Sequence, residues 1–447
     1  MPEGIPSEPV GAIPTRAEEV SWMEASIWTP RMVAALETGV KGGRWFSVID
    51  KVYKKENLEA AYHQVHRNKG KPGIDHVTTK AFGEKLSENI AKLQQQLRDG
   101  TYRPSALKRV MIPKPGSNEM RPLSIPTVRD RVVQCAVKHA IEPIFENTFA
   151  ECSYGFRPGR GCKDALREVD SALRAGYHYV VDCDIRQYFD TIPHDRLMTK
   201  VSQLISDSKV LALLRQMLQQ GVMTIDDEWT PEQGTPQGGV ISPLLANIYL
   251  NDLDQELLDT EAKPTRYADD LVILCRSQNK AEGILARIRE WMTENGLELH
   301  PTKTRIVDMG KPGNSFDFLG YTFIHREKNG ISRLVRIPRK KSLHRFRDTI
   351  RGLTPRISGV RLEHTIKRIN SVSRGWFAYF QQCASPVFDE VDVFIRRRLR
   401  AILLKRKRRP AFGTRHAHVL WPNSYFTAQG LFSMTQAHAA VRNSARR

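Results

Sequence analysis

The segment TRYADDLVILC, residues 265–275, constrains the fold more than any other part of the sequence. It places two adjacent acids, Asp269 and Asp270, between two apolar stretches that are typical of β-strands. This pattern predicts a β-hairpin with the acids at its tip. Adjacent carboxylates repel each other and raise each other's pKa unless a cation compensates their charge. The segment therefore predicts a small sheet with a cation site at the end of one hairpin.

A second strand, YHYVVDCDI at residues 177–185, also ends in acids. Its alternation puts Asp182 and Asp184 on one face and apolar side chains such as Val181 on the other. Taken alone, this segment is better explained as a solvated edge strand. Together with the hairpin acids it favours phosphoryl transfer, which uses two metal ions held by hard oxygen ligands from neighbouring strands.

The charge of the chain favours a polyanionic partner. The 69 Lys and Arg residues exceed the 49 Asp and Glu residues, which gives a formal net charge of +20. Such an excess predicts binding to a phosphate backbone, although a merely basic protein, such as a ribosome-associated enzyme, has a similar balance. Charge alone does not distinguish DNA from RNA.

Several features predict an intracellular, cytoplasmic protein with no membrane partner. The six cysteines are scattered without a CxxC pair, which argues against structural zinc and a disulfide framework. No run of 18 apolar residues occurs, and the N-terminal segment MPEGIPSEPVGAIPTRAEEV lacks the apolar core of a signal peptide.

The order of predicted elements indicates an α+β fold. ALKRVMIPKPGSNEMRPLSIP, residues 106–126, predicts a hairpin with PGSN at its turn, and helices are predicted over 127–150 and 162–175. Amphipathic helices ending at Gly70 and Gly100 precede them. After Gly330 the composition shifts toward helix-forming and basic residues, which predicts a domain boundary there.

Seven blocks in this order resemble the reverse transcriptases of group II introns, over about residues 50–400. The blocks are RPLSIP (121–126), YGFRPGRG (154–161), VDCDIRQYFDTI (181–192), QGTPQGGVISPLLANIYL (233–250), YADD (267–270), LELHPTKTRIV (297–307) and FDFLGYTF (316–323). The resemblance implies a right-hand polymerase of the α+β class with a helical C-terminal maturase or thumb domain. The expected parts are a lead-in (1–49), fingers (50–165), a palm with the catalytic core (166–330) and the thumb or maturase domain (331–447).

The same resemblance implies the catalytic residues. Asp184, Asp269 and Asp270 match the family's catalytic acids and are expected to hold the metal, with Ile185 counted in the metal site. Two Mg²⁺ ions are the expected cofactor, with Mn²⁺ as a substitute. Asp182 does not match the family's catalytic position and is treated as secondary.

Further residues are expected to contact the nucleotide: Lys114, Arg121, Phe189, Gln237, Gly238 and Lys303. Phe189 would lie beneath the sugar and exclude a 2′-hydroxyl, although an ordinary core phenylalanine is a competing explanation. The two cations of the fingers hairpin suit a triphosphate, or are solvated surface charges. Lys303 would protonate the leaving pyrophosphate, or form a structural ion pair.

Three more expectations concern loops and helix ends. Asp190 is expected to cap or brace the loop that follows it. Ser242 is a fair N-cap with Pro243 after it. The segment FLG, residues 318–320, resembles the family's primer-grip hairpin, although its apolar residues also suit a core.

The C-terminal part carries a basic helix in which nine of the fourteen residues 396–409 are Lys or Arg. This density predicts contact with structured RNA, and the residues expected to make it are Arg396, Arg397, Arg400, Lys405 and Arg408. A localisation signal or a membrane-surface helix is the alternative. The tail after Pro410 has no Cys or His cluster, so no endonuclease is expected.

The resemblance implies an RNA-directed DNA polymerase that binds its own intron RNA, assists splicing and copies that RNA during retrohoming. Its expected partners are the intron RNA, an RNA template with a DNA primer, dNTPs and target DNA; the oligomeric state is not predicted. Two rivals stay open: a related reverse transcriptase domesticated for phage defence, CRISPR adaptation or DNA repair, and an RNA-binding splicing factor with an idle polymerase fold.

Overall fold

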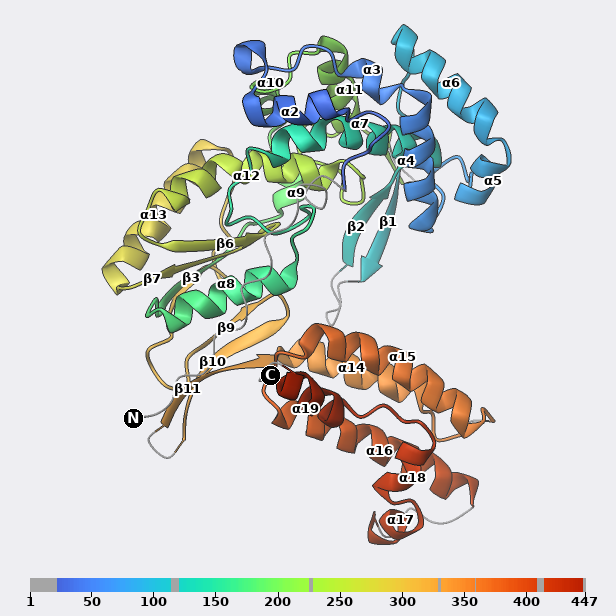
Figure 1. The fold of residues 1–447 in the computed structure, drawn as a ribbon, viewed down its shortest axis with the longest axis vertical. Helices are drawn as coiled ribbons and strands as arrows, with labels where there is room; N and C mark the ends of the chain where they lie inside the picture. Colours follow the sequence, from blue (N-terminus) through green and yellow to red (C-terminus); the bar gives the residue numbers. More distant parts are fainter. Residues whose placement is uncertain are drawn as a thin grey trace. The chain divides into compact units, whose positions relative to one another are not determined.

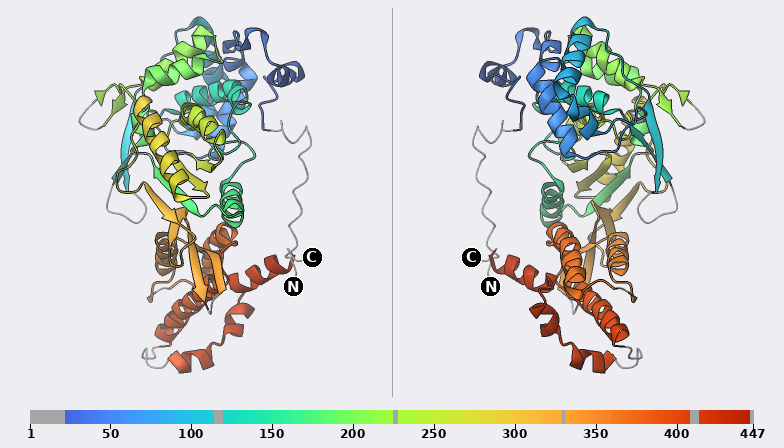
Figure 2. Two further views of the ribbon diagram at one scale, coloured as in Figure 1. Left: turned by 90° about the vertical axis from the view of Figure 1, so that its left-hand side faces the viewer. Right: turned by 90° about the vertical axis from the view of Figure 1, so that its right-hand side faces the viewer.

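The computed structural model describes residues 22–113, 120–224, 228–328, 331–357, 359–407 and 414–444 (Figures 1 and 2). One compact unit ends at Asp308 and a second begins at Met309, and each is described by itself. Helices combined with small sheets confirm the predicted α+β class. All six cysteines are free thiols. Within the described ranges, every helix is too short or too polar to cross a bilayer.

The first unit opens with a group of helices around α7. They are α2 (Pro30–Thr38), α3 (Ile49–Val52), α4 (Lys55–Arg67), α5 (Thr79–Glu84), α6 (Leu86–Asp99) and α7 (Val128–Glu146), with a 3₁₀ turn at Lys41–Gly43. Gly100 ends α6 in the left-handed conformation, as predicted (φ 71°). The predicted helix end at Gly70 was wrong by a few residues. Helix α4 stops at Arg67, and Lys69, not Gly70, has a positive φ.

The predicted hairpin of residues 106–126 is confirmed. Strands β1 (Leu107–Pro113) and β2 (Met120–Ile125) pair antiparallel, and the PGSN turn lies outside the described residues. Two short strands, β4 (Val222–Met223) and β5 (Glu228–Trp229), extend the sheet in the order β2-β1-β4-β5.

A four-stranded antiparallel sheet carries the acids. It is built from β3 (Tyr179–Asp184), β6 (Lys263–Tyr267), β7 (Asp270–Cys275) and β8 (Arg305–Asp308), in the order β6-β7-β3-β8. Val181 and Cys183 of β3 and Ile273 of β7 belong to the main core. Because strand side chains alternate, Asp182 and Asp184 lie on the opposite face, as predicted.

Helices cover both sides of this sheet (Figures 1 and 2). The remaining helices of the unit are α8 (Cys162–Arg174), α9 (Tyr188–Thr191), α10 (His194–Ser202), α11 (Ser208–Leu218), α12 (Ser242–Leu258) and α13 (Gln278–Glu294). α13 packs on β3, β7 and β8, whereas α8 packs on β6 and β7. The predicted N-cap of α12 was wrong: Ile241 takes that position, and the Ser242 hydroxyl donates instead to the Pro236 carbonyl at 2.9 Å.

The second unit combines a small sheet with a helical bundle. Strands β9 (Ser315–Phe318), β10 (Tyr321–Lys328) and β11 (Ile331–Pro338) precede α14 (Lys340–Leu353), α15 (Leu362–Phe380), α16 (Pro386–Arg406), α17 (Thr414–Leu420), α18 (Asn423–Ala428) and α19 (Met434–Ser444). The division between units lies at 308/309 rather than at the expected 330/331. A boundary at 330/331 would separate β10 from β11, which pair over eight residues.

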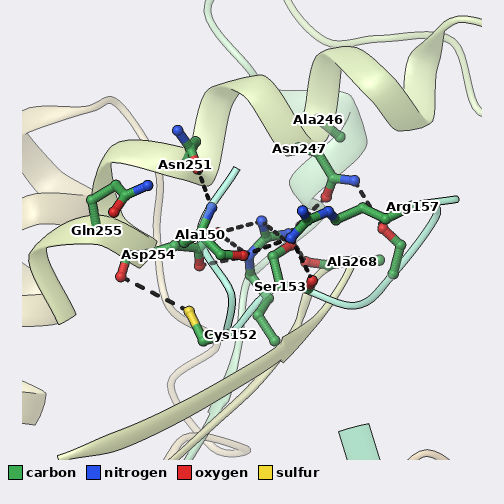
Figure 3. A network of polar contacts seen from close by, with 12 residues as sticks. Ala150, Cys152, Ser153, Arg157, Ala246, Asn247, Asn251, Asp254, Gln255 and Ala268 are labelled. Atoms are coloured by element: carbon green, nitrogen blue, oxygen red, sulfur yellow. Dashed lines mark hydrogen bonds and ion pairs between the residues drawn. The ribbon is translucent and has the colours of Figure 1, made fainter. Parts of the chain in front are cut away.

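A buried arginine fixes the tip of the β6–β7 hairpin. The Arg266 guanidinium donates through Nε to Asp254 of α12 at 2.8 and 2.9 Å, and both side chains are almost fully buried. Its Nη1 donates to Asn247 Oδ1 and to the Ala268 carbonyl, both at 2.9 Å, and its Nη2 donates to Ser153 Oγ at 2.7 Å. Figure 3 shows these partners gathered from α12, the hairpin and the loop before α8.

The charge of Arg266 is compensated despite its burial. Burial alone would lower the pKa of Arg266, but the adjacent Asp254 carboxylate overrides it and raises the pKa above its ordinary value. A second cation, Arg157, holds the same loop by donating to the Ala150 and Ser153 carbonyls at 2.6 and 2.8 Å. The loop, α12 and the hairpin tip are therefore joined behind the acids.

Replacing Arg266 by Met should lower the free energy of unfolding by about 3–5 kcal/mol, because it leaves the Asp254 charge buried without its partner. Urea denaturation followed by circular dichroism measures this loss. The matched control is Arg287→Met, which breaks a half-exposed ion pair with Glu256 and should cost less than about 1 kcal/mol. Adding Asp254→Leu to Arg266→Met should recover part of the loss; equal losses for Arg266→Met and Arg287→Met would contradict the assignment.

Candidate active site

The hairpin tip presents the two adjacent acids differently. Ala268 and Asp269 form the turn between β6 and β7, with Ala268 at φ 60°. Asp270 is the first residue of β7 and lies directly opposite Asp184 of β3. Side chains of directly opposed residues project to the same face, so Asp184 and Asp270 share a face of the sheet.

Asp184 and Asp269 line one cavity of about 790 Å³, together with Ile185 and Lys303. Burial raises the pKa of Asp269, and the negative charge of nearby Asp184 raises it further. Two carboxylates in one cavity, one of them with a raised pKa, constitute a donor set that a divalent cation stabilises.

Lys303 lies beside these acids, with its ammonium 2.5 Å from Asp184 Oδ2. The loop that carries Lys303 is hydrogen-bonded to the segment at the end of β3. The His300 amide donates to the Asp184 carbonyl at 2.7 Å, and the Arg186 amide donates to the Glu298 carbonyl at 2.8 Å. The sequence allowed Lys303 to be a proton donor or a member of a structural ion pair, and the ion pair is present in the structure.

The protein supplies only part of a metal's ligands. Within the described ranges, no three His, Cys, Asp or Glu side chains converge as a metal site. Asp184 and Asp269 are carboxylates in one cavity, and Ile185 can contribute only its carbonyl oxygen. Such an incomplete oxygen set fits Mg²⁺, which is commonly held by one or two carboxylates, waters and substrate phosphates.

A glycine lets the loop before α8 approach the hairpin tip. A Cβ on Gly155 would lie 2.3 Å from the Ala268 nitrogen, closer than any real contact. The Asn247 amide donates to the Gly155 carbonyl at 2.8 Å, and the Tyr154 amide donates to the Arg266 carbonyl at 2.9 Å. The block YGFRPGRG therefore supports the acids from behind.

The loop before α12 closes another side of the cavity. Gln237 and Gly238 line it, as do Phe189 of α9 and Arg121 of β2. Phe189 is half-buried and packs against the main core, so both interpretations of this ring are compatible with its position. Arg121 is exposed.

Three of the expected residues are not found in the lining of this cavity: Asp270, which shares a face of the sheet with Asp184, and Lys114 and Asp182. Lys114 is not among the described residues. Asp182 forms an ion pair with the neighbouring strand, where Arg305 Nε lies 3.4 Å from its Oδ2. Asp190 accepts from Gln237 Nε2 at 2.9 Å, so it braces the loop before α12.

Arg266 and its partners are site-supporting residues that sequence reasoning missed. Their signal was an arginine in the predicted hairpin, three positions before Asp269, since a buried charge needs a partner. The sequence does not reveal that Asp254, twelve positions earlier on α12, is the partner.

The basic helix of the second unit divides into buried and exposed cations. Arg400 was wrongly predicted to bind RNA: it is 5% exposed, and it donates to the Trp421 carbonyl at 2.9 Å and to Asn423 Oδ1 at 2.8 Å. Arg396 is mostly covered and lies 3.9 Å from Asp392. Arg397 and Lys405 are exposed, whereas Arg408 lies outside the described residues.

Comparison with known proteins identifies the family. Residues 112–323 match the family model of reverse transcriptase (RNA-dependent DNA polymerase), and residues 343–421 match that of the group II intron, maturase-specific domain. Protein YkfC of Escherichia coli K12 is 34% identical over 61% of this chain and 81% of its own length. The group II intron-encoded protein LtrA of Lactococcus lactis is 39% identical over 47% of this chain.

The chain covers 35% of the length of LtrA. A solved chain of a partial Cas6-RT-Cas1--Cas2 complex is 27% identical, with a TM-score of 0.35, over 56% of this chain and 41% of its own length. The two family matches, with YkfC and LtrA, confirm the predicted family and polymerase-like fold. The chain therefore belongs to the group II intron reverse transcriptases with a maturase domain, a family of divalent-metal-dependent, RNA-directed DNA polymerases.

Proposed function

We propose that this chain copies RNA into DNA at the cavity that contains Asp184 and Asp269, with two Mg²⁺ ions as cofactor and Mn²⁺ as a substitute. The observation that carries the proposal is the pair of carboxylates in one cavity, where burial and mutual charge raise the pKa of Asp269. When bound, the ions supply charge for activating the primer hydroxyl and for holding the pyrophosphate. Asp270, opposite Asp184, contributes negative charge to the same face.

The remaining residues of the cavity orient the substrates. Arg121 is placed to pair with the triphosphate of a dNTP, and Phe189 is placed to exclude a 2′-hydroxyl. Lys303, which pairs with Asp184, carries a proton next to the acids and is proposed to give it to the leaving pyrophosphate. Lys114 is proposed for the same triphosphate on sequence grounds alone.

The proposed template is an intron RNA, which the protein would bind to assist splicing and then copy from a DNA primer at a target site. The match to the maturase-specific domain and the similarity to the intron-encoded LtrA support this over a domesticated role. The +20 net charge suits a polyanionic partner. An intracellular location follows from such a partner, and sequencing the RNA that co-purifies with the protein tests the proposal.

Asp269→Asn should lower DNA synthesis by at least about two orders of magnitude, since a metal contributes several kcal/mol of charge stabilisation in such reactions. Asp270→Asn should lower it less, because this residue does not line the cavity. Extension of oligo(dT) on poly(rA) measures both, and RNA affinity should stay within a few-fold for each variant. Activity of Asp269→Asn above about one per cent of wild type would remove Asp269 from the metal site.

Phe189→Val should raise the incorporation of rNTPs relative to dNTPs by about tenfold or more, because a smaller side chain leaves room for a 2′-hydroxyl. The measurement is kcat/KM for matched dNTP and rNTP on one primer-template. Thermal unfolding of the variant is the companion measurement. A lower unfolding temperature with an unchanged ratio would make Phe189 an ordinary core residue.

Replacing Arg397 and Lys405 by Gln should flatten the slope of log affinity against log salt for structured RNA. The expected change is about 0.7–0.9 per lost phosphate contact. Filter binding across a salt series measures the slope, and primer extension on a short duplex should fall less than RNA binding.

Arg400→Gln is the control, because its buried hydrogen bonds predict lost stability rather than a changed slope at salt concentrations where it is folded. An unaltered slope in the Arg397 and Lys405 variant would place these cations on a solvated face.

A further inference from the structure

Phe156 places an apolar ring in the candidate active-site cavity. It lines this cavity together with Asp184 and Asp269, and it is 50% exposed. Its ring lies against that of Tyr267, with the two centroids 6.4 Å apart. The proposed function gives this ring no task, although an exposed phenylalanine forgoes the free energy that burial of its apolar surface supplies.

The backbone presents the ring against its own conformational preference. Phe156 has φ 60°, in the left-handed region, where the Cβ of any residue other than glycine is crowded by the backbone. Such strain persists only where the surrounding structure over-determines it, and it concentrates at functional sites. Phe156 therefore combines a strained backbone with an apolar side chain that the protein leaves half uncovered.

Both neighbours of Phe156 are fixed, which explains how the strain is maintained. Gly155 lies so close to the hairpin tip that a Cβ on it would be 2.3 Å from the Ala268 nitrogen. On the other side, Arg157 is buried, and its Nε donates to Glu146 Oε1 at 2.9 Å. These anchors keep the ring directed at the cavity, where a ligand can cover it.

The position of Phe156 favours the primer over the incoming nucleotide as that ligand. The residues proposed for the dNTP, Arg121 and Phe189, come from β2 and α9, whereas Phe156 comes from the loop that packs on the hairpin tip. In the proposed function, the primer hydroxyl is activated beside Asp184 and Asp269. The 3′-terminal nucleotide of the primer must therefore lie next to the same hairpin tip.

The chemistry of the primer end identifies the part that a phenyl ring can cover. The terminal base stacks on the preceding base and on the incoming one, and its polar edge pairs with the template. The phosphates are charged and need water or cations. The remaining surface is the sugar, which is apolar at C2′ in deoxyribose but carries a hydroxyl there in ribose. Burying that hydroxyl against a ring with no hydrogen-bonding group costs free energy.

We propose that the Phe156 ring packs against the sugar of the primer's 3′-terminal nucleotide and favours deoxyribose over ribose there. The inference rests on the proposed function and deepens it, because it assigns the choice of a DNA primer to a residue separate from Phe189, which is proposed to select the incoming nucleotide.

The test uses two primers that differ only in their terminal sugar, deoxyribose or ribose, on one RNA template. KM for the primer-template and kcat for the first dNTP addition are measured with the full chain. Wild type should prefer the deoxyribose end by about tenfold in kcat/KM, and Phe156→Ala should reduce this preference to about twofold or less. The KM for the dNTP should not change. Phe46→Ala, which removes another exposed phenylalanine of the same unit, is the control and should keep the wild-type preference.

A second variant separates contact with the primer from a structural role. Phe156→Gly also removes the ring, but glycine takes φ 60° without strain, so this variant should unfold at or above the wild-type temperature while losing the preference. A lower unfolding temperature with the preference retained would make the ring structural. A loss of discrimination between dNTPs and rNTPs with an unchanged primer preference would place the ring at the incoming nucleotide. Either result overturns the proposal.

Fluorescence anisotropy with both primers, in the absence of dNTP, measures the preference without catalysis. Equal affinity of wild type for the two primers, together with equal kcat/KM, also overturns the proposal. Absence of DNA synthesis by wild type, with the preference present in binding and lost in Phe156→Ala, would instead overturn the proposed function alone.

Discussion

The buried ion pair between Arg266 and Asp254 is the interaction on which the geometry of the acids depends. Removing two charges from water is expensive, and a buried pair is tolerated only when its other hydrogen-bonding groups are also satisfied. That condition is met, because all five N–H donors of Arg266 have acceptors, on Asp254, Asn247, Ser153 and the Ala268 carbonyl. The last of these acceptors immediately precedes Asp269, so the cation fixes the backbone that carries the acid.

The hydrogen bonds of Arg266 hold the hairpin tip in place, and this allows two like charges to lie close together in the cavity. Burial and the charge of Asp184 raise the pKa of Asp269, and freely mobile side chains of like charge would move apart. The turn cannot relax easily, because Gly155 leaves no room behind it and Arg266 holds its carbonyl. Lys303 compensates part of the charge from the open side of the cavity. The turn that carries the acids is held rigidly by hydrogen bonds, whereas the negative charge of the acids in the cavity is only partly compensated. Together these two features create a site that favours a divalent cation.

The sequence predicted those features that depend on local patterns. The β6–β7 and β1–β2 hairpins follow from short apolar runs separated by turn residues, and α13 follows from its amphipathic period. Contacts between distant segments could not be predicted in this way. The Asp207 carboxylate, for example, accepts at 2.8 Å from the amides of Val48 and Ile49, about 160 positions earlier. The acceptors of Arg266 could not be predicted either, because an arginine in a strand does not reveal its partner.

Contacts between distant segments also limit what the sequence predicts for the basic helix, where they decide which cations are available to RNA. Its composition predicted a cationic surface, and Arg397 and Lys405 are indeed exposed. Which cations face inward, however, is decided by the helices that pack on α16. The Trp421 carbonyl and Asn423 supply acceptors that turn Arg400 into an internal brace. Arginine suits both tasks, because its planar fork satisfies several acceptors when buried and contacts phosphate when exposed. Counting basic residues therefore overestimates an RNA-binding face wherever a neighbouring element offers acceptors, and the exposed subset is the one that a salt titration of RNA binding reports.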